Sequence, residues 1–407
     1  MLSETTLAYG ARAMTALLGV DALYRHGSGD VDGLAVLNMD AEGRYPADSF
    51  GGYDDARACF TELNSAAADL PEEDRRVYYA QLCLSTLAFI EWRQRGLSFR
   101  SQLSDFLHVP AEPASEEALN TVRKMIRIFL TKMGYTGDLA SQAAAWEERH
   151  RVPRDDVQEV LEDLLDEAWD RTEDQLQRIR APKSDGMKVS TVSDVAYNAR
   201  CNYAERTIQI NVDPVLTRPG LKHLAIHEGY PGHYLQFKLR ETMAADGTAA
   251  PDVLISVVNS ASSCVFEGIA DYGIRMIRWG ATDDDLLQEL MNQYRAGIGT
   301  GAAWRLHELG WEEGKVTDWL RGQSLVGGEG WVVNRMRFIA APSRAVLIWS
   351  YWFGERCVAP AYVDASDADR PAFIEYLYGR MHSPQSVGMF DGRTLTPFDE
   401  GDGITWS

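Results

Sequence analysis

The chain has 407 residues, of which 45% are hydrophobic, and a formal net charge of −20. A chain of this length and apolar content can bury a large core, arranged as two or three structural units or as one merged globule. The acidic charge argues against nucleic acids and anionic membrane surfaces as partners, because both attract lysine and arginine.

The cysteines and the first residues bear on where the protein works. The five cysteines are scattered, odd in number and never spaced as Cys-x-x-Cys, which favours a reducing compartment over a disulfide framework or a cysteine-ligated zinc site. Residues 1–24 lack a basic segment and have an interrupted apolar run, which is typical of an amphipathic helix rather than a signal peptide. No stretch reaches the ~18 apolar residues needed to span a bilayer. We therefore expect a cytoplasmic protein.

Helical patterns fill the first part of the chain, residues 1–185. Apolar residues recur at helical spacing in four segments of this part, 52–70, 73–95, 115–134 and 153–180. Pro71 can open the second of these helices, and Gly134 can end the third. The dense acids of the fourth segment are expected to form a solvated face.

The second part, residues 186–407, begins within a boundary rich in Pro, Ser, Asp and Gly at 181–191. Residues 206–213 then alternate between apolar and polar side chains, which is the one convincing strand signal in the chain. After this strand the chain returns to helical patterns until about residue 380. The sequence therefore predicts a mainly α protein with a small sheet, in which the two parts merge into one globule.

The stretch LAIHEGYPGHYLQ, residues 224–236, carries the first chemical motif. His227 and Glu228 begin like the zinc motif in which two histidines stand at i and i+4 on one helix face. Here the second histidine, His233, follows at i+6, and a straight helix would turn it to roughly the opposite face. A shared metal site therefore requires a bent backbone between the two rings.

Two acids downstream supply a possible third ligand. The segment SSCVFEGIADYGIRMI, residues 262–277, places Glu267 and Asp271 four residues apart on an otherwise apolar helix. Because burying a bare carboxylate is costly, such acids are paired or bound to metal. Zinc peptidases with Glu as third ligand use this spacing: the Glu binds zinc, and the Asp one turn later holds a ligand histidine by its other ring nitrogen. A capping or salt-bridge role is the alternative for both acids.

Together these motifs resemble the domain-of-unknown-function family 885, whose members carry His-Glu-x-x-Pro-Gly-His-x-x-Gln and then Glu-Gly-x-Ala-x-Tyr. The resemblance covers roughly residues 190–390. It implies a zincin-like metallohydrolase fold of the clan with Glu as third ligand, with a small β-sheet at the active-site cleft. It also implies that His227, His233 and Glu267 bind zinc and that Glu228 is the general base.

The resemblance also accounts for the residues between the two histidines. Pro231 lacks an N–H, and its ring would clash with the carbonyl group of His227 in a regular helix. Gly229 and Gly232 allow backbone angles that other residues avoid. The prediction is a local distortion that inserts two residues and returns His233 to the side of His227.

Weaker matches to the family follow downstream. Residues 305–316 align His307 with a family histidine, Arg337 lies in a second matching segment, and Tyr351 begins a third. The resemblance makes these three side chains candidate donors to the oxyanion that forms during hydrolysis. The strand at 206–213 would lie at the edge of the cleft and pair with an extended substrate.

Other positions depart from the family pattern. Ala303 stands where the family has Asp, Trp304-Arg305 replaces Thr-Gly, and Arg344 replaces a Gln. We therefore expect a small, carbonyl-bearing substrate or a short peptide, with an aromatic supply from Trp304, Trp349, Tyr351 and Trp352. Arg305 and Arg344 suggest a carboxylate on that substrate, and pairing with the chain's own acids is the alternative.

The predicted function is a zinc-dependent hydrolase that cleaves an amide or peptide-type bond. Two alternatives stay open: a zincin-fold biosynthetic enzyme that runs a different zinc reaction on a small metabolite, and a non-catalytic binding protein. The altered positions favour an unusual substrate. Glu228 beside a complete ligand set argues against a binding protein without activity.

Overall fold

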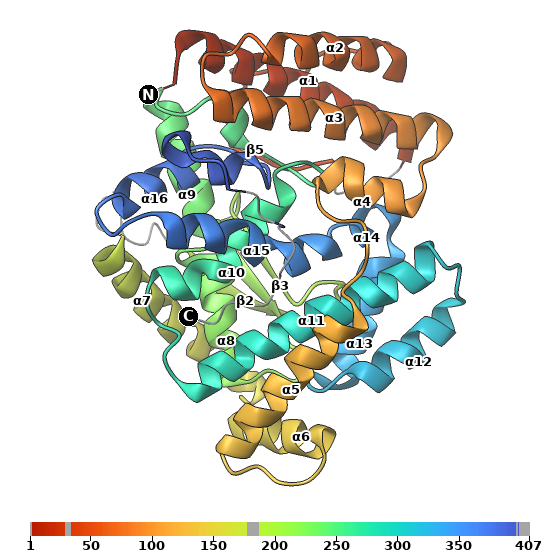
Figure 1. Cartoon of the computed structure of the whole chain (residues 1–407), viewed down its shortest axis with the longest axis vertical. Helices are drawn as coiled ribbons and strands as arrows, with labels where there is room; N and C mark the ends of the chain where they lie inside the picture. Colours follow the sequence, from red (N-terminus) through yellow and green to blue (C-terminus); the bar gives the residue numbers. More distant parts are fainter. Residues whose placement is uncertain (1, 29–33, 177–186, 396–397, 399–407) are drawn as a thin grey trace. The chain divides into compact units, whose positions relative to one another are not determined.

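The structure, a computed structural model, describes residues 2–28, 34–176, 187–395 and 398 (Figure 1). Helices dominate this part of the chain, which confirms the prediction of a mainly α protein with small sheets. None of the helices in these ranges is both long and apolar enough to cross a membrane. The predicted boundary between residues 185 and 186 lies outside the described residues.

The chain groups into two compact units, and each unit combines separate stretches of sequence. The first unit contains Met1–Ala111, Gln236–Ile269 and Phe353–Ser407, and the second contains Glu112–Leu235 and Ala270–Trp352. The grouping therefore does not follow the order of the two predicted parts. Helices α9 (His233–Ala245), α10 (Ser263–Met276) and α15 (Ile348–Asp364) each contribute residues to both units.

The first unit begins with three helices that lie side by side in Figure 1, α1 to α3. Its further elements are α4, the short strands β1 and β5, which pair antiparallel, a 3₁₀ turn, α16 and a final irregular turn. Their bounds are α1 Glu4–Ser28, β1 Ala35–Asn38, α2 Tyr53–Ala67, α3 Glu73–Arg95, α4 Phe99–Leu107, η3 Pro251–Leu254, β5 Ile255–Val257, α16 Arg370–Tyr378 and η4 Ser386–Gly392.

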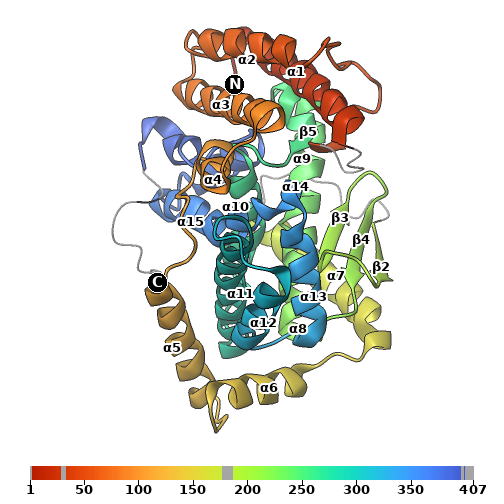
Figure 2. The ribbon, with the colours of Figure 1, turned by 90° about the vertical axis from the view of Figure 1, so that its right-hand side faces the viewer.

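The second unit joins several helices to a three-stranded sheet, whose strands lie together near α7 in Figure 2. Its elements are α5 Glu116–Lys132, α6 Leu139–His150, η1 Arg154–Asp156, α7 Val157–Gln175, β2 Lys188–Val192, β3 Ala199–Asn202, β4 Thr207–Asn211, α8 Arg218–Leu224, the π-helix η2 Ala225–Gly229, α11 Asp283–His307, α12 Glu313–Gln323, α13 Gly328–Ala340 and α14 Pro342–Ala345.

The helices predicted in the first part of the chain are confirmed, with ends set by the expected chemistry. Helix α5 begins where the Ser115 hydroxyl accepts a hydrogen bond from the Ala118 N–H, an N-cap interaction that satisfies a free backbone donor. It ends just before Gly134, which has a φ of 89° that other residues rarely adopt. Helix α7 buries the apolar face that includes Leu161 and Leu165, as the periodicity predicts.

The predicted strand at 206–213 forms as β4, but its place in the sheet differs from the prediction. Ile208 and Ile210 are fully buried, which is why the alternation in the sequence marks this strand clearly. The strand order is β2-β4-β3, with β2 parallel and β3 antiparallel to β4. Because both sides of β4 are paired, the expectation that this strand binds an extended substrate is wrong. Among the strands that the structure describes, β2 and β3 form the two edges of this sheet.

Candidate metal centre

The chain between the two motif histidines is a helix that widens, breaks and restarts. Helix α8 runs into the π-helix η2, and α9 begins at His233. The Tyr230 N–H donates to the Ala225 carbonyl at 3.1 Å and the Gly232 N–H to the Ile226 carbonyl at 2.9 Å, five and six residues back. The imidazole centroids of His227 and His233 consequently lie 4.6 Å apart. The predicted distortion that brings the two rings together is therefore confirmed.

The two glycines of the motif are required for space rather than for unusual backbone angles. Neither Gly229 nor Gly232 is among the residues with positive φ, so neither uses the left-handed conformation that glycine allows. A Cβ atom at Gly232 would lie 1.9 Å from the carbonyl oxygen of His227 and 2.3 Å from that of Ile226. At Gly229 it would lie 2.4 Å from the Cδ2 atom of Leu165. Close approach of backbone to backbone is thus what Gly232 permits.

Three predicted ligands come together. One ligand atom each from His227, His233 and Glu267 lies within 4.8 Å of the others. All three residues are buried, and each is 7% exposed. They come from η2, the first residue of α9 and α10. Two imidazoles and one carboxylate are a donor set that zinc uses in catalytic sites, with one coordination position left for water or substrate. The residues present therefore fit a zinc ion.

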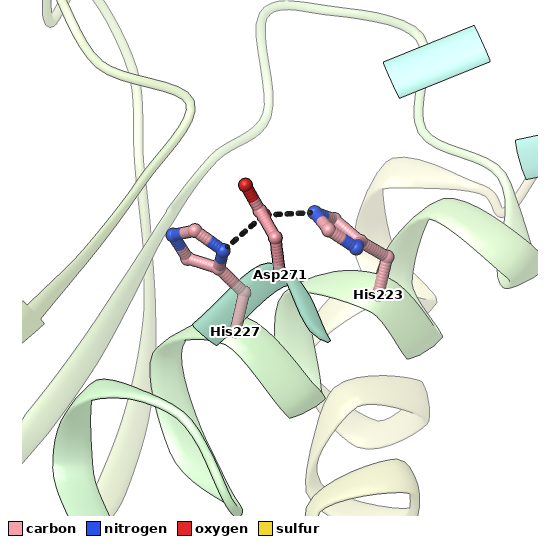
Figure 3. A group of neighbouring side chains, drawn as sticks. All are labelled: His223, His227 and Asp271. Carbon is pink, nitrogen blue, oxygen red and sulfur yellow. Dashed lines mark hydrogen bonds and ion pairs between the residues drawn. The ribbon is translucent and has the colours of Figure 1, made fainter. Parts of the chain in front are cut away.

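Asp271 fixes how His227 can be used. The Nδ1 atom of His227 lies 2.8 Å from Oδ1 of Asp271, and the other ring nitrogen points away from the carboxylate (Figure 3). A carboxylate that accepts a hydrogen bond from Nδ1–H selects the tautomer with its lone pair on Nε2, the nitrogen that would bind a metal. Asp271 thus stands where the predicted role, orientation of a ligand histidine, places it.

A second histidine, His223, lies on the other side of Asp271 (Figure 3). Its Nε2 atom is 3.7 Å from the same Oδ1, and its ring centroid is 5.5 Å from that of His227. Burial lowers the pKa of His223 to about 4, although the nearby Asp271 carboxylate acts in the opposite direction. The imidazole is therefore neutral at pH 7.

His223 was missed from the sequence although a signal was present. It precedes His227 by four residues, a spacing that places two side chains on one helix face. The interpretation of the motif considered only the histidines on either side of the break. Nothing in the local sequence shows that Asp271, from a helix 44 residues later, lies between the rings.

Glu228, the predicted general base, is 6% exposed and follows His227 directly in η2. The edge strand β3 packs against this π-helix. Its Cys201 thiol has a pKa well above the ordinary value, because burial and, to a smaller extent, the negative charge of Glu228 disfavour the thiolate. The free edge of the sheet nearest to Glu228 therefore belongs to β3.

The three candidate oxyanion donors lie in the second unit and contact other groups. The Nε2 atom of His307, at the end of α11, lies 2.6 Å from the Ile339 carbonyl oxygen. The Arg337 guanidinium forms an exposed ion pair with Asp194 at 2.6 Å. The Tyr351 ring lies 6.4 Å from the ring of Phe338. These contacts do not assign an oxyanion role to any of the three.

Two of the predicted substrate-binding residues have structural contacts. The Arg305 guanidinium lies 3.9 Å from the ring centroid of Trp319 and donates to the Gly301 carbonyl. Trp349 is 0% exposed, and its indole N–H donates to the Glu112 carbonyl at 3.1 Å. Trp349 therefore belongs to the core, and its assignment to the aromatic supply around a substrate is wrong.

Comparison with known proteins gives the fold but no activity. No family model matches the sequence, and no curated protein matches it. A solved structure of a candidate lipoprotein from Colwellia psychrerythraea is similar over 82% of this chain, with a TM-score of 0.55 and 12% identity, and the match spans 65% of that structure. A candidate lipoprotein of unknown function from Shewanella oneidensis matches over 82% of this chain and 70% of its own, with a TM-score of 0.48 and 14% identity. At this level of identity, the Colwellia structure shows a similar fold and nothing more.

Proposed function

We propose that the protein is a zinc-dependent hydrolase that cleaves an amide or peptide-type bond of a small substrate, on a zincin-like fold related to family 885. The observation that supports this most is that the His227 ring contacts a carboxylate on one side and belongs to a cluster of possible ligands on the other. Its Nδ1 atom is occupied by Asp271 at 2.8 Å, while a ligand atom of the ring clusters with those of His233 and Glu267. That arrangement serves a metal ligand better than a packed core histidine.

The two histidines and Glu267 would hold the ion. When bound, zinc would act as a Lewis acid that polarises a carbonyl group of the substrate and lowers the pKa of water, so that the water can lose a proton and attack near neutral pH. The protein supplies orientation: the π-helix sets the position of His227, the start of α9 sets that of His233, and Asp271 fixes the tautomer of His227.

Glu228 would move the proton. It follows His227 in the chain and is buried, so its carboxylate is shielded from bulk solvent. In the proposed site it would lie beside the attacking water. A carboxylate so placed accepts a proton from water and passes it to the leaving nitrogen. Removal of this acceptor leaves the ligands in place, which separates its role from theirs.

The proposed substrate is a small molecule or a short peptide in the cytoplasm. The net charge of −20 supports a partner other than nucleic acid or an anionic membrane. Since β4 is paired on both sides, β3 takes its place as the strand that could pair with an extended part of the substrate.

Metal analysis and turnover test the proposal together. The purified protein should contain close to one equivalent of zinc, and His233→Ala should lose most of it. His26→Ala is the control, because His26 is exposed on α1. Glu228→Gln should keep metal and fold while its turnover of the best amide substrate falls by orders of magnitude. Full zinc occupancy in His233→Ala would remove the basis for the site.

A different zinc-dependent reaction is the second candidate, and the altered positions favour it. Ala303, which replaces the family's Asp, is fully buried in α11, so no carboxylate is available there. Arg305 stacks on Trp319 where the family has a glycine. A panel of dipeptides, N-acyl amino acids and long peptides separates the candidates, since zinc binding without hydrolysis of any member would favour the second.

A further inference from the structure

The Asp271 carboxylate contacts His227 on one side and faces His223 on the other. Oδ1 lies 2.8 Å from Nδ1 of His227 and 3.7 Å from Nε2 of His223. The Asp271 and His223 side chains are each 18% exposed, so solvent reaches this carboxylate only in part. The His223 ring lies on the side of the carboxylate opposite His227 (Figure 3).

Two readings of this group are possible, because the three residues could also hold a second ion. A second ion would need the Nδ1 lone pair of His227. A neutral imidazole has one protonated and one unprotonated nitrogen, and the 2.8 Å contact with a carboxylate identifies Nδ1 as the protonated one. Metal binding at Nε2 and metal binding at Nδ1 therefore exclude each other in neutral His227. Metal binding in the cluster with His233 and Glu267 leaves Nδ1 for Asp271.

We propose that His223 is a positioning residue for the zinc site: it holds the Asp271 carboxylate on Nδ1 of His227, and it is not itself a metal ligand. This inference rests on the proposed zinc site at His227, His233 and Glu267. His223 confines Asp271 from the side opposite His227, because its Nε2 atom lies 3.7 Å from the same Oδ1 atom that His227 contacts at 2.8 Å. A ligand histidine that donates to a carboxylate is more basic and better oriented.

The position of His223 in the chain explains how it can do this. It lies one helical turn before His227, and the two rings are held by consecutive turns of α8 and η2. Asp271 comes from α10, whose Gly273 brings the two segments close: a Cβ atom there would lie 2.9 Å from a side-chain carbon of Ile226. The approach of the two helices thus sets the carboxylate between the rings.

Zinc affinity, measured by competition with a chromogenic chelator, tests the inference without any substrate. His223→Ala should bind one equivalent of zinc with an affinity about 10-fold weaker, the lower end of the range for groups that orient ligands. His223→Gln should restore most of the affinity, because its amide nitrogen can take the place of Nε2. His150→Ala is a matched control: His150 also faces an aspartate, Asp284, at 3.2 Å, and its side chain is 21% exposed.

A double-mutant cycle separates positioning from a general structural role. If His223 acts through Asp271, His223→Ala should add little to the loss caused by Asp271→Asn. Additive losses, or an equal loss in His150→Ala, would overturn the inference. A second equivalent of zinc in the wild type that disappears in His223→Ala would also overturn it, since His223 would then be a ligand. Absence of zinc from the wild type would instead refute the proposed function.

Discussion

The most direct test of the helix break is the substitution Gly232→Ala. The added Cβ atom would meet two backbone oxygens, at 1.9 Å from that of His227 and at 2.3 Å from that of Ile226. Ordinary contact begins at 3.4 Å, so the carbonyl group of His227 must move by about 1.5 Å from the added Cβ atom. No side-chain rotation can relieve this contact, because both oxygens belong to the main chain.

The expected size of the effect follows from these distances. Overpacking of a rigid site costs about 1–3 kcal/mol, and loss of the 2.9 Å hydrogen bond from the Gly232 N–H to Ile226 adds about 1 kcal/mol. We expect the free energy of unfolding to fall by about 2–4 kcal/mol. Because a displacement of about 1 Å can cost 10²-fold in activity, zinc binding and turnover should suffer more than stability.

Two other glycines provide graded controls for urea unfolding and zinc competition. Gly322→Ala, inside α12 with open space around it, should stabilise by about 0.5–1 kcal/mol. Gly229→Ala meets only the end of the Leu165 side chain, which can rotate, so its effect should be intermediate. If Gly232→Ala unfolded and bound zinc like Gly322→Ala, the assignment of Gly232 to a backbone contact would be wrong.

Three further predictions concern single side chains. Asp271→Asn should weaken zinc binding by roughly 10- to 100-fold without abolishing it, as measured by chelator competition, and unchanged affinity would exclude its orienting role. Burial raises the pKa of Asp252 to about 6, so the folded protein binds this proton more tightly than the unfolded chain and loses the corresponding stability as pH rises from about 4 through 6. Relative to the wild type, Asp252→Asn should therefore gain about 3 kcal/mol between pH 4 and pH 8 in urea unfolding, whereas a constant difference would contradict the assignment. Arg337→Ala should change stability by less than about 1 kcal/mol, because its ion pair is exposed, and a lowered kcat with unchanged KM would identify it as an oxyanion donor.

More of the candidate site than of the fold could be predicted from the sequence. That His227, His233 and Glu267 lie together could be predicted because a metal site would restrict residue type and spacing, and the motif that breaks the helix is short and local. The reason for the glycines could not be predicted, since a contact between Gly232 and the His227 carbonyl depends on the path of a π-helix. Such a helix has no sequence periodicity of its own that a window of apolar residues would reveal.

The strands β4 and β3 illustrate a more general limit of prediction from sequence. Strand β4 was recognisable because Ile208 and Ile210 alternate with polar residues, and that alternation exists because the strand is central and half of it is buried. Strand β3, Ala199–Asn202, is short, carries mixed residues and has no fully buried position. A short edge strand with mixed residues, such as β3, lacks the periodic signal by which a strand is recognised in a sequence. If the proposed hydrolase pairs a sheet edge with its substrate, β3 beside Glu228 is therefore the first strand to test, although the sequence marks it least.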